Sequence, residues 1–139
     1  REISVKDSLE TELTATRRFD VDKAKTIGFM GEDARVYSTP SLVHDIEVTC
    51  MEFLAEHLDE GESSVGARVE LDHTAPTLLG MWVDITATIA GLKGRAVNFE
   101  VTARDAVDEV ARCTHIRFVV DVARTKERLA AKAAKAKEA

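Results

Sequence analysis

The sequence predicts an α+β fold in which one antiparallel sheet packs against a single long helix. A stretch with helical periodicity, about residues 39–58, interrupts a series of segments whose apolar residues alternate with period two. Short turns join the alternating segments that follow it, and such short connections are typical of antiparallel strands. With 139 residues, the chain is long enough for one domain with a hydrophobic core.

The helix has a marked start and two distinct faces. We expect Thr39 to be its N-cap, because a threonine hydroxyl accepts a hydrogen bond from a free N–H of the first turn, and Pro40 to be its first helical residue. The apolar stripe at helical spacing consists of Leu42, Val43, Ile46, Cys50, Phe53, Leu54 and Leu58. The opposite, solvent-facing side is expected to carry Asp45, Thr49, Glu52 and Glu56.

Glu47 does not fit this division into faces. It lies four residues after Val43 and seven before Leu54, so it points along the apolar stripe. A carboxylate on the buried side of a helix is costly unless another group pairs with it or uses it. Glu52 belongs to the solvent-facing side, so helical geometry singles out Glu47 as the candidate functional carboxylate.

The alternating segments predict five strands. A first strand is expected near residues 8–17, and residues 20–37 form an irregular segment that could cover a pocket. The next strand begins at Val65, and continuing its period of two places His73 on the apolar face. The remaining strands are expected at about residues 81–89, 97–104 and 110–122.

A sheet of five strands needs an apolar partner for one face, and the stripe of the helix supplies it. One curved antiparallel sheet around a central helix is the arrangement known as the hotdog fold. We expect residues 1–123 to form this single domain. Residues 124–139 have strong helix propensity but almost no apolar stripe, which predicts a solvated helix or a frayed tail.

The composition argues against several classes of protein. The formal charge of −6 argues against a nucleic-acid partner, which needs a basic surface. No apolar run approaches the roughly 20 residues that span a bilayer, and no secretory signal opens the sequence, so we expect neither a membrane partner nor secretion. Cys50 and Cys113 lack the spacing of metal ligands. We therefore expect two reduced thiols, a cytoplasmic location, and neither a metal nor a cofactor.

Three polar residues are candidates for catalysis where the helix meets the sheet. Glu47 could act as nucleophile or base, His73 as proton carrier and Thr39 as an orienting hydroxyl, a set that suits acyl transfer. Two of them have a simpler alternative, Thr39 as a helix cap only and His73 as a hydrogen-bonded core histidine. His115 is ambiguous, and Gly66 marks either a β-bulge or a place where a ligand approaches the backbone.

Three runs of the sequence resemble one family. They are STPSLVHDIE, GESSVGARVELDHTAPTLLG and RDAVDEVARCTHIR, and they extend the resemblance over roughly residues 36–120. In combination they resemble the fluoroacetyl-CoA thioesterase-like proteins of the hotdog superfamily. The resemblance implies a homodimer that hydrolyses acyl-CoA thioesters without a metal, and it leaves open whether dimers pair into a dimer of dimers.

The family pattern also assigns site residues. Its threonine, the glutamate eight positions later and the histidine that follows a V-G strand fall on Thr39, Glu47 and His73. The glycine near the acyl group matches Gly66, and the arginine of the T-H-x-R segment matches Arg117. The resemblance therefore implies catalytic roles for the first three residues and substrate-binding roles for Gly66 and Arg117.

The segment before the helix bears on the expected substrate. The fluoroacetyl-specific enzyme carries a phenylalanine-bearing lid there, whereas GFMGEDARVY is shorter and offers Phe29, Met30 and Tyr37. We expect Phe29 to contact the substrate and leave the acyl group open. The expected function is an acyl-CoA thioesterase that hydrolyses a small acyl-CoA to free acid and CoA. A non-catalytic acyl-CoA-binding module and, less favoured, an enoyl-CoA hydratase are the alternatives.

Overall fold

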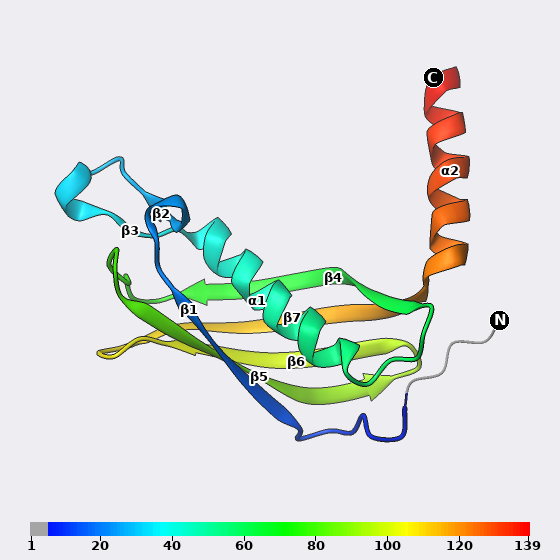
Figure 1. The fold of residues 1–139 in the computed structure, drawn as a ribbon, viewed down its shortest axis with the longest axis horizontal. Coiled ribbons are helices and arrows are strands. Elements are labelled where there is room, and N and C mark those ends of the chain that lie inside the picture. The colour runs from blue at the N-terminus through cyan, green and yellow to red at the C-terminus, as the bar shows by residue number, and fades with distance from the viewer. Residues whose placement is uncertain (1–5) are drawn as a thin grey trace.

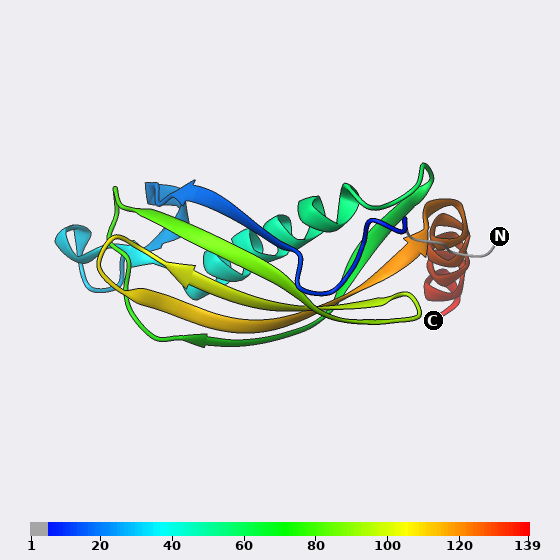
Figure 2. The same cartoon turned by 90° about the horizontal axis from the view of Figure 1, so that it is seen from below.

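The computed structural model describes residues 6–139 and has one five-stranded antiparallel sheet with a long helix packed on one face (Figures 1 and 2). The strand order in the sheet is β1-β5-β6-β7-β4. The strands are β1 (Thr14–Asp20), β4 (Glu62–His73), β5 (Trp82–Lys93), β6 (Ala96–Arg104) and β7 (Glu109–Asp121). The helices are α1 (Thr39–Ala55) and α2 (Val122–Glu138). This architecture confirms the predicted α+β arrangement.

The segment between β1 and α1 is built from short elements. It contains two 3-10 turns, η1 (Lys23–Lys25) and η2 (Glu32–Ala34), and a two-stranded sheet of β2 (Thr26–Ile27) and β3 (Val36–Tyr37). The backbone N–H of Ser38 donates to the Lys25 carbonyl oxygen at 2.8 Å, which ties the start of α1 to this segment. The segment therefore lies beside the first turn of the helix (Figure 1).

The start of α1 differs from the prediction by one residue. Ser38 is the N-cap, since its backbone is extended and its hydroxyl accepts a hydrogen bond from the Ser41 N–H at 3.2 Å. The prediction that Thr39 caps the helix is therefore wrong. Thr39 is the first residue of the helix, and its hydroxyl is free to bond elsewhere. The predicted end was also late, because α1 stops at Ala55.

The solvent-facing side predicted for α1 is partly buried. Asp45 and Thr49 are 2% and 3% exposed, which contradicts the expectation that both face water. The carboxylate of Asp45 accepts a hydrogen bond from the Tyr37 hydroxyl and pairs with the Lys25 ammonium at 3.0 Å. The segment before the helix thus covers this side of α1 and supplies the partners that a buried carboxylate needs.

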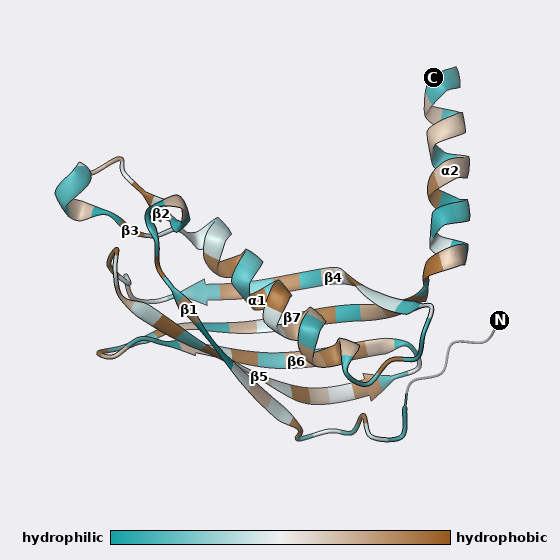
Figure 3. Cartoon of the chain, viewed as in Figure 1, coloured by the Kyte–Doolittle hydropathy of each residue, from teal (hydrophilic) through white to brown (hydrophobic). Residues whose placement is uncertain are grey.

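The hydrophobic core lies between α1 and the concave side of the sheet. Alternate residues of the central strands point toward the helix, as expected for a period of two, and the colouring of Figure 3 follows this alternation. The stripe of α1 meets them with Leu42, Ile46, Cys50, Phe53 and Leu54, all buried. Burial on this scale fixes the helix against the strands that carry the candidate site.

The first strand begins later than predicted. Residues 8–13 do not belong to it, because Glu12 has a φ of +71°, a left-handed conformation that an extended strand does not accommodate. β1 then runs to Asp20, three residues beyond the expected end, and pairs with β5.

A β-bulge interrupts the alternation predicted for β4. The pairing of β4 with β7 shifts register between Gly66 and Arg68, so the prediction of an unbroken period of two from Val65 is wrong. Gly66 lies opposite Arg117 on the face that meets α1, whereas Val65 lies on the other face. After the bulge the strand ends at His73, which returns to the α1 face.

The chain ends in a helix that projects from the end of β7 (Figure 1). Asp121 caps α2, since its carboxylate accepts a hydrogen bond from the Arg124 N–H. None of the residues of α2 is buried. Within residues 6–139, no helix combines the length and the apolar character that crossing a membrane requires.

Candidate active site

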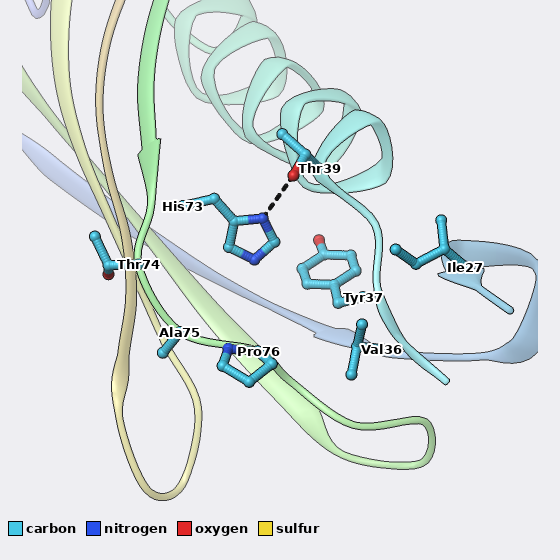
Figure 4. A pocket seen from close by; sticks show the side chains of 8 residues that line it. All are labelled: Ile27, Val36, Tyr37, Thr39, His73, Thr74, Ala75 and Pro76. Carbon is cyan, nitrogen blue, oxygen red and sulfur yellow. Dashed lines mark hydrogen bonds between the residues drawn. The ribbon is translucent and has the colours of Figure 1, made fainter. Parts of the chain in front are cut away.

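Thr39 and His73 meet at the start of α1. The Thr39 Oγ1 atom lies 2.8 Å from His73 Nδ1, within hydrogen-bond distance. Figure 4 shows the two side chains pointing toward each other, one from the first turn of α1 and one from the end of β4. They border a cavity of about 240 Å³ that is lined by Ile27, Val36, Tyr37, Thr39, His73, Thr74, Ala75 and Pro76.

The surroundings of His73 favour its neutral form. Burial lowers the pKa of the imidazole below its usual value, and a backbone group of Ala75 opposes this effect in part. The buried Nε2 atom of His73 has no hydrogen-bond partner among the described residues. A neutral imidazole whose Nδ1 is bonded and whose Nε2 has no partner can accept or donate a proton at Nε2.

Glu47 lies at the edge of the helix stripe and pairs with a buried arginine. Its side chain is 41% exposed, and its Oε2 atom lies 3.4 Å from Nη1 of Arg117, whose side chain is 5% exposed. Arg117 also donates from Nε to the Ser64 hydroxyl at 2.8 Å and from Nη2 to the Ser64 carbonyl oxygen at 3.0 Å. A buried guanidinium needs such partners, so Arg117 is anchored within the protein.

The absence of a side chain at Gly66 leaves the space that the Glu47 carboxylate occupies. A Cβ atom built at Gly66 would lie 2.8 Å from Glu47 Oε2, closer than real Cβ contacts allow. The same Cβ would lie 3.4 Å from Nη1 of Arg117. The glycine at the bulge therefore permits a close approach of helix and strand, here between the β4 backbone and a side chain of α1.

The three predicted catalytic residues do not all meet within the chain. Thr39 and Glu47 are eight residues apart on α1, which places them about 12 Å apart along the helix axis. Among the described residues, no hydrogen bond or ion pair joins Glu47 to His73. His73 bonds to the Thr39 hydroxyl, and Glu47 pairs with Arg117. Both pairs lie along one seam between α1 and the sheet: Thr39–His73 joins α1 to β4, and Glu47–Arg117 joins α1 to β7 beside Gly66 of β4.

Phe29 lies away from this seam. It is 87% exposed, beside the exposed Met30, and it does not line the cavity next to Thr39. Tyr37 from the same segment does line that cavity. Within this single chain, Phe29 is therefore not in position to make the expected contact with the substrate.

The sequence left His115 ambiguous and did not single out Ser64, and the structure places both against Arg117. His115 is fully buried and lies 3.1 Å from Arg117 through its Nε2 atom, and Ser64 supplies two acceptors to the same arginine. The signal for both was their position on the face of the sheet that Arg117 shares, which needs the register of β4 and β7. The residues that the structure describes include no cluster of three or more His, Cys, Asp or Glu side chains suited to a metal ion.

Comparison with known proteins identifies the family. The family model described as fluoroacetyl-CoA-specific thioesterase matches residues 21–123. The fluoroacetyl-CoA thioesterase of Streptantibioticus cattleyicolor is 32% identical over 123 residues, which cover 84% of this chain and 88% of that protein. A solved structure of the fluoroacetyl-CoA thioesterase, 28% identical, has a TM-score of 0.83 and covers 91% of this chain and 98% of that chain.

The fold has further solved relatives. A hot-dog-like protein from Thermanaerovibrio acidaminovorans, 25% identical, has a TM-score of 0.81 and covers 88% of this chain and 91% of that chain. These similarities confirm the hotdog fold predicted from the order of helix and strands. The family model and the curated relative agree with the resemblance found in the sequence, and the chain belongs to the fluoroacetyl-CoA-specific thioesterase family.

Proposed function

We propose that this protein hydrolyses the thioester of a small acyl-CoA to the free acid and CoA. The observation that carries the proposal is the Thr39–His73 hydrogen bond at the border of a cavity, in a chain that belongs to a thioesterase family. The cavity of about 240 Å³ is smaller than the 300–1,000 Å³ typical of drug-sized ligands. Its size favours a short acyl group over a long chain, and nothing in it selects fluoroacetyl over other short groups.

Each proposed catalytic residue has a chemical task. Glu47 attacks the thioester carbonyl itself or removes a proton from the water that attacks it. Neutral His73 carries a proton to the departing CoA sulfur, and the Thr39 hydroxyl orients the imidazole. The C–S bond breaks, water supplies the new oxygen of the acid, and its proton ends on the CoA thiol. Gly66, Arg117 and Phe29 are proposed to contact the substrate.

A homodimer would complete this site. The outer edge of β4 is unpaired within the described chain, and unpaired edges are normally covered or paired. Apolar side chains are exposed on β4 itself and on α1 one turn after Glu47, namely Val69 at 38% and Met51 at 39% exposure. Antiparallel pairing of two copies of β4 centred on Glu70, with the bulged residues 66 and 67 counted as one position, would place Gly66 of one copy opposite His73 of the other. The Glu47 carboxylate of one copy would then lie near the Thr39–His73 pair of the other, which the distance along one helix does not allow.

The proposal is tested by thiol release from a panel of acyl-CoA thioesters, measured with the purified protein. Turnover that is fastest for short acyl groups supports it. Tight binding of acyl-CoA without thiol release would instead indicate a binding module. Consumption of the double bond of crotonyl-CoA without thiol release would indicate a hydratase.

The dimer is tested separately by sedimentation and by mixing variants. A stable monomer at micromolar concentration contradicts it. Mixed dimers of a Glu47→Ala chain and a His73→Ala chain should recover activity that neither homodimer has, because one of their two sites would be intact. Whether dimers pair further is read from the same sedimentation data. We further propose a cytoplasmic location, in which the free Cys50 and Cys113 thiols stay reduced.

A further inference from the structure

His115 lies between two groups that determine where its proton sits. Its Nδ1 atom is 2.8 Å from the Arg68 carbonyl oxygen, and its Nε2 atom is 3.1 Å from Nη1 of Arg117. A carbonyl oxygen can only accept and a guanidinium can only donate. Nδ1 must therefore carry the hydrogen, and Nε2 must accept from Arg117. The surroundings select one tautomer of the neutral imidazole.

The environment of His115 also opposes its protonation. The residue is fully buried and stacks on Phe99, with ring centroids 6.4 Å apart. Burial lowers the pKa of His115; the Arg68 hydrogen bond and Glu47 act in the opposite direction, and Arg117 lowers it further. A proton on Nε2 would face the guanidinium directly. His115 is thus unsuited to carry protons, although it is next to the candidate site.

Arg117 divides the two hydrogens of Nη1 between two partners. One points to His115 Nε2 at 3.1 Å and the other to Glu47 Oε2 at 3.4 Å. Ser64 holds the remaining side of the guanidinium through Nε and Nη2. The planar group cannot rotate without breaking several of these bonds at once. The direction of the N–H that meets Glu47 is therefore set by Ser64 and His115 together, and His115 is the acceptor bound to the same nitrogen, Nη1.

We infer that His115 is a positioning residue, which holds the Arg117 guanidinium so that Arg117 orients the Glu47 carboxylate. The kinetic part of this inference rests on the proposed function. Its structural part, the tautomer and the hydrogen bond to Arg117, does not. A histidine that merely filled the core would be replaceable by an apolar ring of similar size with no effect on Glu47.

The structural part is tested by NMR on the whole protein labelled with ¹⁵N. Long-range correlations of the His115 ring at pH 7.5 should show a protonated Nδ1 and an unprotonated Nε2. The Arg117 Nη1 hydrogens should exchange slowly in the parent protein and faster in His115→Phe. A protonated Nε2, or Arg117 exchange that is unchanged in the variant, overturns the inference.

The kinetic part compares two substitutions. His115→Phe keeps a ring against Phe99 but removes the acceptor, and it should lower kcat about 10²-fold with KM within threefold, since a misplaced catalytic group costs about that much. His115→Gln retains an acceptor, and its kcat should be roughly tenfold higher than that of His115→Phe. His57→Phe is the matched control, because the His57 ring bonds to Ser8 and packs on Phe53 without contacting Arg117 or Glu47 in the described hydrogen bonds and ion pairs, and it should keep the parent kcat.

The outcomes separate the two proposals. Equal loss in the Phe and Gln variants, or parent-like kcat in His115→Phe, overturns the positioning role. If the parent protein releases no thiol from any acyl-CoA, the proposed function fails and the NMR result alone decides the role of His115. If His115→Phe does not fold, the parent tautomer and the Gln variant give the decision.

Discussion

Substituting alanine for Gly66 should separate catalysis from stability. The new Cβ would lie 2.8 Å from Glu47 Oε2, while ordinary van der Waals contacts begin near 3.4 Å. The carboxylate must therefore retreat by at least about 0.6 Å, the difference between these two distances. Because the nearest atom is the end of a flexible side chain, the move is cheap for the fold but shifts the proposed nucleophile or base. The new Cβ would also lie 3.3 Å from Cε1 of buried His115, so that ring must give slightly.

The expected loss of activity is large, and the expected loss of stability is small. A displacement approaching 1 Å of a catalytic group costs up to about 10² in rate, or about 2.7 kcal/mol in the barrier. Alanine at a position without a positive φ restricts the unfolded chain and stabilises by up to about 1 kcal/mol, which offsets the crowding. We expect kcat to fall about 10²-fold while the free energy of unfolding stays within about 1 kcal/mol of the parent.

A matched control is present in the same sheet. Gly91 also lies at a register shift, between β5 and β6, and a Cβ there would have its nearest neighbour at 3.8 Å. Gly91→Ala should leave kcat unchanged. Thiol release and urea unfolding are measured on both variants and the parent. The reasoning is refuted if Gly66→Ala keeps the parent kcat, or if the two variants lose activity equally.

Three further predictions concern single groups. His73→Gln should lower kcat/KM by about 10²–10⁴. The variant should also lose the fall in rate below neutral pH, because the lowered pKa of His73 places the protonation of the imidazole there. A pH–rate profile unchanged from the parent would contradict this. Tyr37→Phe should lower the free energy of unfolding by about 1–3 kcal/mol in urea titrations, since it takes a hydroxyl donor from buried Asp45, and an unchanged midpoint would contradict that. Because the pKa of His115 is lowered in the folded protein, the unfolded chain takes up a proton on this imidazole below about pH 6.5 more readily than the folded chain does. The contribution of His115 to the free energy of unfolding is therefore fully present above that pH and is lost as pH falls, by at most about 1.4 kcal/mol per pH unit. Thermal unfolding of His115→Phe should accordingly depend less on pH between 5 and 7 than that of the parent, and equal slopes would count against the neutral imidazole.

The order of elements was predictable because it rests on periodicity. Each central strand buries every second residue, and the helix stripe is long enough to identify α1 from its spacing alone. Boundaries were less predictable because neighbouring residues compete for one role. Ser38 and Thr39 are both good caps; in the structure the first caps the helix and the hydroxyl of the second bonds to the His73 imidazole, a contact between distant residues that local sequence does not contain.

The candidate site was predictable only in part. Helical geometry separated Glu47 from Glu52, and in the structure the two carboxylates have different partners, buried Arg117 and the more exposed Arg17. That Glu47 is catalytic stays a prediction. The partner of Glu47 could not be predicted from spacing, because Arg117 lies on β7 and meets Glu47 in the space beside Gly66, which requires the register of β4 with β7. The burial of Asp45 likewise depends on a distant segment that a helical wheel does not contain.

The role of Glu47 is the central claim, and the chain offers a matched pair of variants to test it. Glu47→Ala and Glu52→Ala remove the same group from the same helix, five residues apart. Glu47 faces the seam with β4 and pairs with buried Arg117, whereas Glu52 pairs with Arg17 of β1; the two carboxylate side chains are 41% and 54% exposed. Both variants must first show the parent circular dichroism spectrum and unfolding midpoint.

The decisive measurement is then the rate of thiol release by the parent and both variants on the acyl-CoA that the parent hydrolyses fastest. The account predicts that Glu47→Ala loses about 10²–10⁴ in kcat while Glu52→Ala stays near the parent value. Equal rates for the two folded variants would contradict it and remove Glu47 from the mechanism.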